Sequence, residues 1–574
     1  MGRSHRFVFI GWENYERTNV LRFALIFRVK NMVYTESIFK RKDKKWTFGP
    51  KAAIMDFHFV QRGNFQKKTE SGNASMQKID PFISLYRREL FPGSIQPAGE
   101  NLDSATDAFY FQFKGIRISR VGFGCYRVGL ENPAHKKALV LALRSGVNLI
   151  DTSANYGDGE AESLVGEVLS EEFAFGNIKR ESVCVVTKAG YIQGRNMEIA
   201  EQREVAGNPF PETTYYQPGC FHCISPEFLE DQLERSRKRL GLYTIDIFLL
   251  HNPEYFLMDQ RKHGVPEKTA KQEYYRRIRD AFSFLERARA DGRILYYGIS
   301  SNTFPDKEDS YTDTSLSKVL QIAKEVGGED SGFAVAQFPA NWYEDGFLRN
   351  HNSAGENLLA ICRNFDILPL INRPLNSFVS DKGMVRLAYR PGPDQETRIA
   401  ALESLFKELR TYETPLHDLP ESQTGFKSLS AQWFGYREKI PNIEQLHQLL
   451  GRSWIPAAQS SLKFISDRLG KEEAIRYTNL LNKTIPYFEE WIVLHQAEAR
   501  LPLYEELKGR FHSDRHSPNS LSSMMVLHLS QLLQKGTVLV GMRKEEYVKD
   551  ILELKNQVWS PISEEEWGYH GIRS

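Results

Sequence analysis

The sequence predicts an α/β fold in which eight parallel strands close into a barrel, and three observations support this. Eight apolar, β-branched runs recur along the chain and are too continuous for strands with one face in water. Stretches with the apolar spacing of packed helices separate these runs. The region that holds them is close to the roughly 250 residues of a (β/α)8 barrel, the TIM-barrel architecture.

The ordered part of the chain is expected to begin with a β-hairpin. Residues 109–113 and 116–119 are joined by Lys114 and Gly115, a two-residue connection typical of antiparallel strands. The eight barrel strands are predicted at residues 121–125, 147–152, 183–188, 245–251, 295–301, 334–338, 367–371 and 537–542.

Helices are predicted between these strands. Asn132 before Pro133 is a helix start signal, and Gly146, Gly241 and Gly292 are stop signals. The expected helices cover residues 133–145, 161–170, 226–240, 272–290, 316–326 and 520–534.

The connection between the seventh and eighth strands is far longer than one crossover helix needs. Residues 379–518 are therefore predicted to be a helical insertion, which interrupts a barrel made of residues 109–378 and 519–558 and followed by a tail, 559–574. Helical spacing with aromatic anchors occurs at residues 443–450, 457–469, 471–481, 485–498 and 504–511.

Residues 1–108 form a basic extension that is predicted to be poorly ordered. Residues 1–70 hold 15 Lys and Arg against 6 Asp and Glu. One interpretation is a basic arm for a membrane or RNA. We favour a solvated leader, or translated sequence upstream of a start at Met55 or Met76, because charge runs of this kind are usually solvated.

Composition excludes several classes of protein. The formal net charge of +2 argues against a nucleic-acid binder, and no apolar run approaches the roughly 18 residues of a membrane span. Five cysteines do not resemble a secreted disulfide framework, so we expect a cytoplasmic protein. Cys220 and Cys223 have CxxC spacing without a second ligand pair, so no metal site is predicted.

Polar residues stand where three predicted strands end. Asp151, Lys188 and His251 close strands two, three and four, and Tyr156 lies in the loop after Asp151. In such a barrel these carboxyl ends converge on the active site. Taken singly, each has a structural interpretation: an ion pair at the barrel mouth, a rim histidine or a packing aromatic. Four at the correct positions favour catalysis.

Reduction of a carbonyl explains these residue types. Tyr156 is the expected proton donor, and a nearby Lys188 ammonium is expected to lower the pKa of its phenol. Asp151 would pair with Lys188, and His251 would polarise the carbonyl oxygen. The hydride must come from a cofactor, because no side chain supplies one.

The chain resembles the aldo-keto reductase family. The resemblance rests on VGFGCYRVG, SGVNLIDTSANYGDGEAESLVGEVL, VVTKAG, RLGLYTIDIFLLHNP, ILYYGISSNT and VLVGMRKEEYV, and it covers residues 109 to about 378 and 520–552. It implies that Asp151, Tyr156, Lys188 and His251 are the family's catalytic tetrad. Neither residues 1–108 nor the insertion is covered.

The resemblance also implies a nicotinamide cofactor. Ser300, with Ser301 or Asn302, and Gln337 correspond to residues that bind the carboxamide, and Gly541 and Arg543 to the segment at the adenosine phosphate. An arginine there suits a 2′-phosphate, which favours NADPH over NADH. Many members have a stacking aromatic after strand seven, where this chain has Asn372 and Arg373. Arg373 is therefore an alternative contact for phosphate or an acidic substrate.

Two functional hypotheses follow. The first is a reductase that transfers hydride between NADPH, or NADH, and a small aldehyde, ketone or sugar. The second is a cofactor-binding regulatory or scaffold protein with little turnover, whose helical insertion is the surface for a partner protein.

Overall fold

The computed structural model describes residues 41–42, 45–46, 108–352, 354–379, 383–388, 395–417, 426–441, 443–498, 501–502, 505, 520–557 and 559–570. The chain divides into two units, Met1–Lys78 and Ile79–Ser574. The predicted extension, residues 1–108, lies outside the described residues except for Ala108 and two short antiparallel strands, β1 (Arg41–Lys42) and β2 (Lys45–Trp46).

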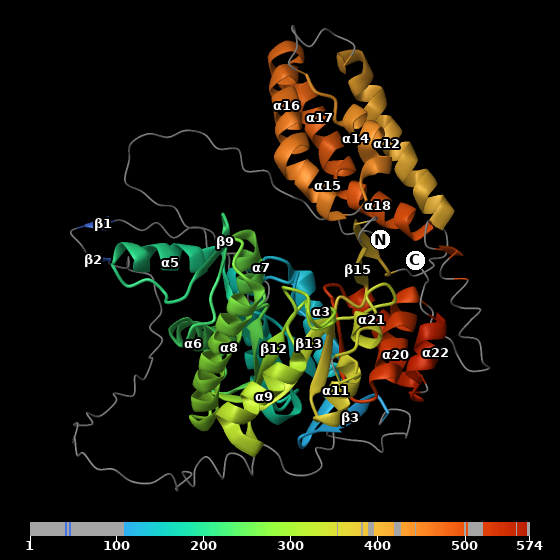
Figure 1. The fold of residues 1–574 in the computed structure, drawn as a ribbon. Coiled ribbons are helices and arrows are strands. Elements are labelled where there is room, and N and C mark those ends of the chain that lie inside the picture. The colour runs from blue at the N-terminus through green and yellow to red at the C-terminus, as the bar shows by residue number, and fades with distance from the viewer. Residues whose placement is uncertain are drawn as a thin grey trace. The chain divides into compact units, whose positions relative to one another are not determined.

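Eight parallel strands form a closed barrel, as the sequence predicted (Figure 1). All eight predicted runs are present, most with ends shifted by one or two residues. The strands, in barrel order, are β11 (Ile245–His251), β12 (Ile294–Ser300), β13 (Phe333–Pro339), β14 (Leu368–Asn372), β17 (Thr537–Val540), β5 (Val121–Gly124), β6 (Leu149–Asp151) and β7 (Cys184–Ala189).

The strand register brings the predicted polar residues to one rim. His251 is paired with Ser300, and Ser300 is paired with Gln337 on the following strand. Asp151 is the last residue of β6, and Lys188 is the penultimate residue of β7. Because all eight strands are parallel, these residues lie at or near the same, carboxyl, end of the barrel.

A hairpin packs with the inward-facing side chains of the barrel. Strands β3 (Tyr110–Phe113) and β4 (Ile116–Ser119) pair antiparallel around Lys114 and Gly115, both of which have positive φ. Phe111, Phe113, Ile116 and Ile118 share one apolar cluster with Leu149, Val186, Leu249 and other residues from the barrel strands. The hairpin therefore extends the interior core of the barrel.

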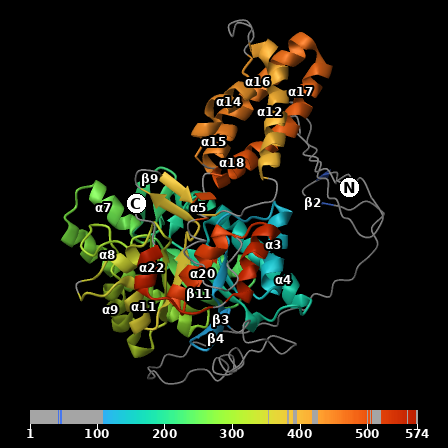
Figure 2. The ribbon, with the colours of Figure 1, turned by 90° about the vertical axis from the view of Figure 1, so that its right-hand side faces the viewer.

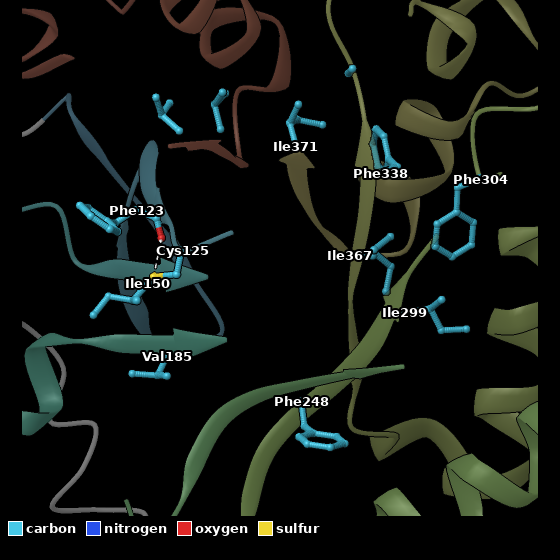
Figure 3. Close-up of a cluster of buried hydrophobic side chains, with 14 of the residues drawn as sticks. Phe123, Cys125, Ile150, Val185, Phe248, Ile299, Phe304, Phe338, Ile367 and Ile371 are labelled. Atoms are coloured by element: carbon cyan, nitrogen blue, oxygen red, sulfur yellow. Dashed lines mark hydrogen bonds between the residues drawn. The ribbon is translucent and has the colours of Figure 1, made fainter. Parts of the chain in front are cut away.

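Helices cover the outside of the barrel, and a second apolar cluster lies between the two layers. Figure 3 shows this cluster, including Phe123, Ile150, Val185, Phe248 and Ile299 from five strands. The helices that follow barrel strands include α3 (Pro133–Arg144), α4 (Glu160–Ala174), α6 (Pro226–Leu240), α8 (Glu267–Ala290), α9 (Leu316–Gly327), α11 (Leu358–Asn364), α20 (Leu521–Leu533) and α21 (Glu545–Leu552).

Capping residues set several helix ends where the sequence predicted them. Asn132 accepts a hydrogen bond from the Ala134 amide at the start of α3. Ser225 accepts from the Phe228 amide at the start of α6, and Gly241 ends that helix with φ 66°.

The connections outside the barrel contain further short elements that the sequence did not predict. Three strands form one sheet: β8 (Tyr191–Ile192), β9 (Thr214–Gln217) and β10 (Cys220–His222). The others are the helices α5 (Arg195–Val205), α7 (Tyr255–Lys262), α10 (Gly346–Arg349) and α22 (Glu564–His570), and 3-10 turns at Tyr156–Gly159, Arg180–Ser182, Gly328–Asp330 and Glu553–Asn556. No helix in the described part of the chain is long and apolar enough to cross a membrane.

The region between β14 and β17 begins with a hairpin and continues as a helical bundle (Figure 2). The predicted helix over residues 504–511 lies outside the described residues apart from Glu505. The elements are β15 (Asn376–Val379), β16 (Gly383–Arg386), α12 (Gln395–His417), α14 (Leu429–Tyr436), a 3-10 turn (Arg437–Lys439), α15 (Ile443–Leu449), a π-helical segment (Leu450–Trp454), α16 (Ile455–Leu469), α17 (Lys471–Thr484) and α18 (Pro486–Glu498).

This bundle has a hydrophobic core of its own. Trp433 stacks on Phe488 with ring centroids 4.2 Å apart, and Trp454 and Trp491 pack around them. Its helices therefore bury their apolar faces against one another.

Candidate active site

Lys188 lies at the centre of the polar rim. Its side chain is fully buried, and its Nζ donates hydrogen bonds to the Asp151 carboxylate and to the Thr152 carbonyl oxygen, both at 2.8 Å. A longer hydrogen bond of 3.4 Å reaches the Tyr156 hydroxyl. An ammonium group this deeply buried requires such partners. Three of the four predicted catalytic residues are thus in direct contact.

A left-handed turn places Tyr156 beside Lys188. Gly157, Asp158 and Gly159 have φ values of 55°, 54° and 91°. Glycine adopts this conformation at little cost, whereas Asp158 pays for it. The Asp158 carboxylate packs against Gly194, where an added Cβ would overlap it. The chain therefore reverses sharply right after the tyrosine, and this limits where the phenol can point.

Tyr156 remains a phenol in this environment. Burial raises its pKa well above 10, and the Asp151 carboxylate raises it further. The sequence predicted a lowered pKa, and that prediction is wrong for the free protein, because burial and the Asp151 carboxylate outweigh the effect of the Lys188 ammonium. Asp151 lies closer to that ammonium than the phenol does, so the carboxylate offsets part of its positive charge. The group is protonated at neutral pH, which is the state that a proton donor requires.

His251 faces the same site in its neutral form. Burial lowers its pKa well below 6.5, and the electrostatic influence of the Lys188 ammonium and, less, of the His222 ring lowers it further. Its Nδ1 lies 3.0 Å from the Ser153 hydroxyl, and the Tyr156 and His251 rings meet edge to face. Among the described residues, Nε2 has no hydrogen-bond partner, so this nitrogen is the one available to a substrate oxygen.

The predicted carboxamide residues are linked to the catalytic ones. Ser300 Oγ donates to Gln337 Oε1 at 2.9 Å, and Gln337 Nε2 donates to Asp151 Oδ1 at 2.8 Å. All three side chains are buried. Ser301 is also buried, and its hydroxyl bonds to Thr303 and Thr314 rather than to Gln337.

Asn302 is the partly exposed member of the Ser300–Asn302 segment. Its backbone N–H donates to the buried Glu254 carboxylate at 2.9 Å. Of the two candidates that the doubled serine left open, Ser301 and Asn302, Asn302 is thus the more accessible.

Gly541 and Arg543 follow the last barrel strand. Gly541 is exposed and has open space at its Cα, and the Lys544 cap begins α21 directly after Arg543. The Arg543 guanidinium lies 3.4 Å from the Glu489 carboxylate of α18. An ion pair of this exposure contributes about 0–1 kcal/mol, so an anionic ligand can displace it.

A comparison with protein families agrees with this arrangement. The model of the aldo/keto reductase family matches residues 120–416, which is just over half of the chain. The chain belongs to the aldo/keto reductase family.

Individual relatives share only about a quarter to a third of their residues with this chain over the aligned part. The NADH-specific methylglyoxal reductase of Escherichia coli K12 is 30% identical over 144 residues, 24% of this chain and 39% of that protein. The D-threo-aldose 1-dehydrogenase of a Pseudomonas species is 26% identical over 194 residues, 33% of this chain and 51% of that protein. The L-glyceraldehyde 3-phosphate reductase of E. coli K12 is 27% identical over 216 residues, with coverages of 37% and 47%. The chain thus spans about two fifths to one half of the length of these relatives.

In this aldo/keto reductase, β14 ends at Asn372, and Arg373 follows it with a φ of 52°. Burial lowers the pKa of Arg373, and its guanidinium donates to Glu344 at 2.6 Å. The side chain is therefore already engaged by a carboxylate.

Several residues of this aldo/keto reductase site were not identified from the sequence. Ser153 bonds to His251, and Tyr191 packs its ring edge against the same imidazole with centroids 4.8 Å apart. Glu254 contacts the Ser300–Asn302 segment. Ser153 lies between Asp151 and Tyr156, and that position was a usable signal. Tyr191 lies in the two-residue strand β8 and Glu254 directly before α7, and nothing in the sequence indicates where either side chain points.

Cys220 and Cys223 are in the small sheet and the loop after it. Cys220 accepts from Gln193, and Cys223 lies 3.2 Å from the Ser225 hydroxyl. Within the described ranges, no group of three His, Cys, Asp or Glu residues is placed to hold a metal ion.

Proposed function

We propose that this chain transfers hydride between NADP(H) and the carbonyl group of a small aldehyde, ketone or sugar. The observation that carries the proposal is the Lys188 ammonium, in contact with both Asp151 and the Tyr156 phenol at the carboxyl end of the barrel. The names of the three relatives describe action on methylglyoxal, an aldose and a phosphorylated aldehyde, and these define the substrate range to test first.

The residues at the rim fit a nicotinamide cofactor. The side-chain oxygen of Asn372 is buried and has no hydrogen-bond partner within the described residues, and the rim also holds the Ser300 and Gln337 side chains. Ser300, Asn302 and Gln337 would hold the carboxamide, and Gly541 and Arg543 the adenosine phosphate. The chemistry that such a cofactor supplies when bound is hydride.

Arg543 favours NADPH, because a guanidinium suits a 2′-phosphate. NADH is the alternative, since one relative is named as specific for it.

The side chains divide the proton chemistry between them. Tyr156 Oη donates its proton to the oxygen that was the carbonyl, and the phenolate left behind is stabilised by Lys188 Nζ. Asp151 keeps that ammonium buried and directed. His251, neutral at physiological pH, orients the substrate oxygen through Nε2.

Purified protein with NADPH and a panel of carbonyl compounds tests the proposal. The expected result is loss of the reduced-nicotinamide absorbance with at least one small aldehyde, ketone or sugar. Tight binding of NADPH without turnover across the panel would contradict it. That outcome would favour the second hypothesis, a regulatory or scaffold protein with the helical bundle as its surface for a partner protein.

A further inference from the structure

Glu254 is a buried carboxyl group behind the Ser300–Asn302 segment. It lies three residues after His251 and directly before α7, and it has no exposed surface. One carboxylate oxygen, Oε1, accepts the backbone N–H of Asn302 at 2.9 Å. The other, Oε2, is buried without a hydrogen-bond partner among the described residues. Burying an ionised carboxylate costs free energy unless its oxygens are paired or hydrogen-bonded, and here only one of the two oxygens accepts a hydrogen bond from a described residue.

Hydroxyl groups connect the same segment to the surrounding helices. Ser301 Oγ lies 3.1 Å from the Thr303 hydroxyl, which lies 3.0 Å from that of Thr314. Tyr274 of α8 completes the chain at 2.8 Å from Thr314. These four side chains are buried, so the segment that carries Asn302 is held both by a hydroxyl network and by Glu254.

Near neutral pH the Glu254 carboxyl group is divided between its protonated and its ionised form. Its pKa is raised to about 7, because burial raises it by more than the hydrogen bonds from its own backbone, from Asn302 and from Ser301 lower it, and the Asp306 carboxylate raises it further. The other titratable groups that face it are the phenols of Tyr191 on β8, Tyr255 on α7 and Tyr274 on α8. The carboxylate helps to raise the pKa of each phenol. These phenols therefore stay neutral near pH 7.

We propose that Glu254 is a positioning residue for cofactor binding. Its carboxylate fixes the Asn302 backbone, and protonation of the carboxylate weakens nicotinamide binding. A carboxylate accepts a hydrogen bond more strongly than a carboxylic acid does. The ionised form thus orders the Asn302 peptide in the orientation that presents its side chain to the carboxamide. The proposal rests on the function proposed above and deepens it by assigning a pH-sensitive residue to the cofactor site.

Binding of NADH measured from pH 6 to pH 8 tests this. NADH is the suitable probe because it lacks the 2′-phosphate, which itself titrates near pH 6. His251 and His222 are neutral throughout this interval, because burial lowers the pKa of both, that of His222 to about 4. The dissociation constant of the wild type is expected to fall about fivefold as the pH rises, with a midpoint near 7.

Three variants isolate the carboxyl group. Glu254→Gln keeps an acceptor oxygen but does not titrate, so its NADH affinity should be weak and independent of pH. Glu254→Asp, which restores the charge, should regain a pH dependence. Asp306→Asn removes the neighbouring negative charge without touching Asn302, so the midpoint should move to lower pH.

The outcomes separate this inference from the proposed function. A wild type that binds neither NADH nor NADPH overturns both. A wild type that binds NADH, with the same pH dependence in Glu254→Gln, overturns only the role of Glu254. If Glu254→Gln fails to fold, an unmoved midpoint in Asp306→Asn overturns that role by itself.

Discussion

The side-chain amide of Gln337 donates a 2.8 Å hydrogen bond to Asp151, a residue 186 positions earlier in the chain. The same carboxylate accepts from Lys188. The residue expected at the nicotinamide carboxamide and the residues expected to deliver the proton therefore belong to one buried network. A substitution among the cofactor-binding residues should therefore affect the proton-donating residues, and the reverse, so substitutions can test the site.

Tyr156→Phe removes only the hydroxyl group that is assigned as the proton donor. We expect kcat to fall by about 10²- to 10⁴-fold, the usual contribution of general acid catalysis. NADPH affinity, measured by quenching of protein fluorescence, should change by less than about twofold because the ring remains.

Tyr126→Phe is the matched control. Its ring meets that of Tyr156 edge to face at 5.2 Å, but its side chain is 67% exposed. Its kcat should stay close to that of the wild type. Equal losses in the two variants would show that a general effect on packing, and not proton donation, accounts for the result.

Lys188→Met leaves the Asp151 carboxylate buried without its cation. Breaking a buried pair in this way costs about 3–5 kcal/mol, so urea denaturation should show a loss of that order. The double variant Asp151→Asn/Lys188→Met should recover much of this stability and none of the turnover. Lys136→Met, which breaks exposed pairs with Glu167 and Glu171, should cost less than about 1 kcal/mol. A similar loss in both lysine variants would contradict the assignment of a buried, coupled pair.

Arg543→Ala tests the cofactor preference. We expect the dissociation constant for NADPH to rise by about 10- to 100-fold, the value of a charge-assisted hydrogen bond, while that for NADH changes little. Lys549→Ala, an exposed change in the last turn of α21, is the control and should affect neither cofactor. Calorimetric titration with each cofactor gives both constants. Equal weakening of NADPH and NADH by Arg543→Ala would remove the preference for NADPH.

Ionisation of Glu254 should also change the free energy of unfolding of the free protein with pH. Its pKa rises from 4.5 in a solvated chain to about 7 in the folded state. Between these values the folded protein binds more protons than the unfolded chain, so the folded state loses stability as the pH rises from about 4.5 to 7. At roughly 1.4 kcal/mol per pH unit, the loss is on the order of 3 kcal/mol. The free energy of unfolding of the wild type minus that of Glu254→Gln should follow this decline. A difference that stays constant with pH would contradict it.

Much of the fold and of the catalytic group could be predicted from the sequence, because both depend on local patterns. A strand buried on both faces is a continuous apolar run, and an Asp, Lys or His that ends such a run is visible without a structure. Asp151, Lys188 and His251 were found in this way, and Tyr156 by its spacing from Asp151. The hairpin and most helices on the barrel follow from turn chemistry and helical period.

What could not be predicted depends on contacts between distant segments. Glu254 reads as an ordinary loop residue until the fold brings it to the Asn302 amide, 48 positions away. The pKa of Tyr156 depends on burial and on the relative distances of Asp151 and Lys188, which spacing does not reveal. Strands β8, β9 and β10 are too short to show a period, and their pairing is set by the loops that they share.

The seam between β14 and β17 has a consequence for how the chain is made. The barrel closes through pairs such as Leu370 with Thr537 and Ile371 with Val538, and β17 is also the partner of β5. At about 5–20 residues per second, a ribosome needs roughly 8 to 30 seconds to travel from Asn372 to Thr537. Throughout that interval β5 and β14 each lack the strand that would cover one edge, and such edges invite pairing with other chains. The long connection thus imposes a delay during synthesis in which the nascent chain is most vulnerable to aggregation, and demand for chaperones should be greatest there.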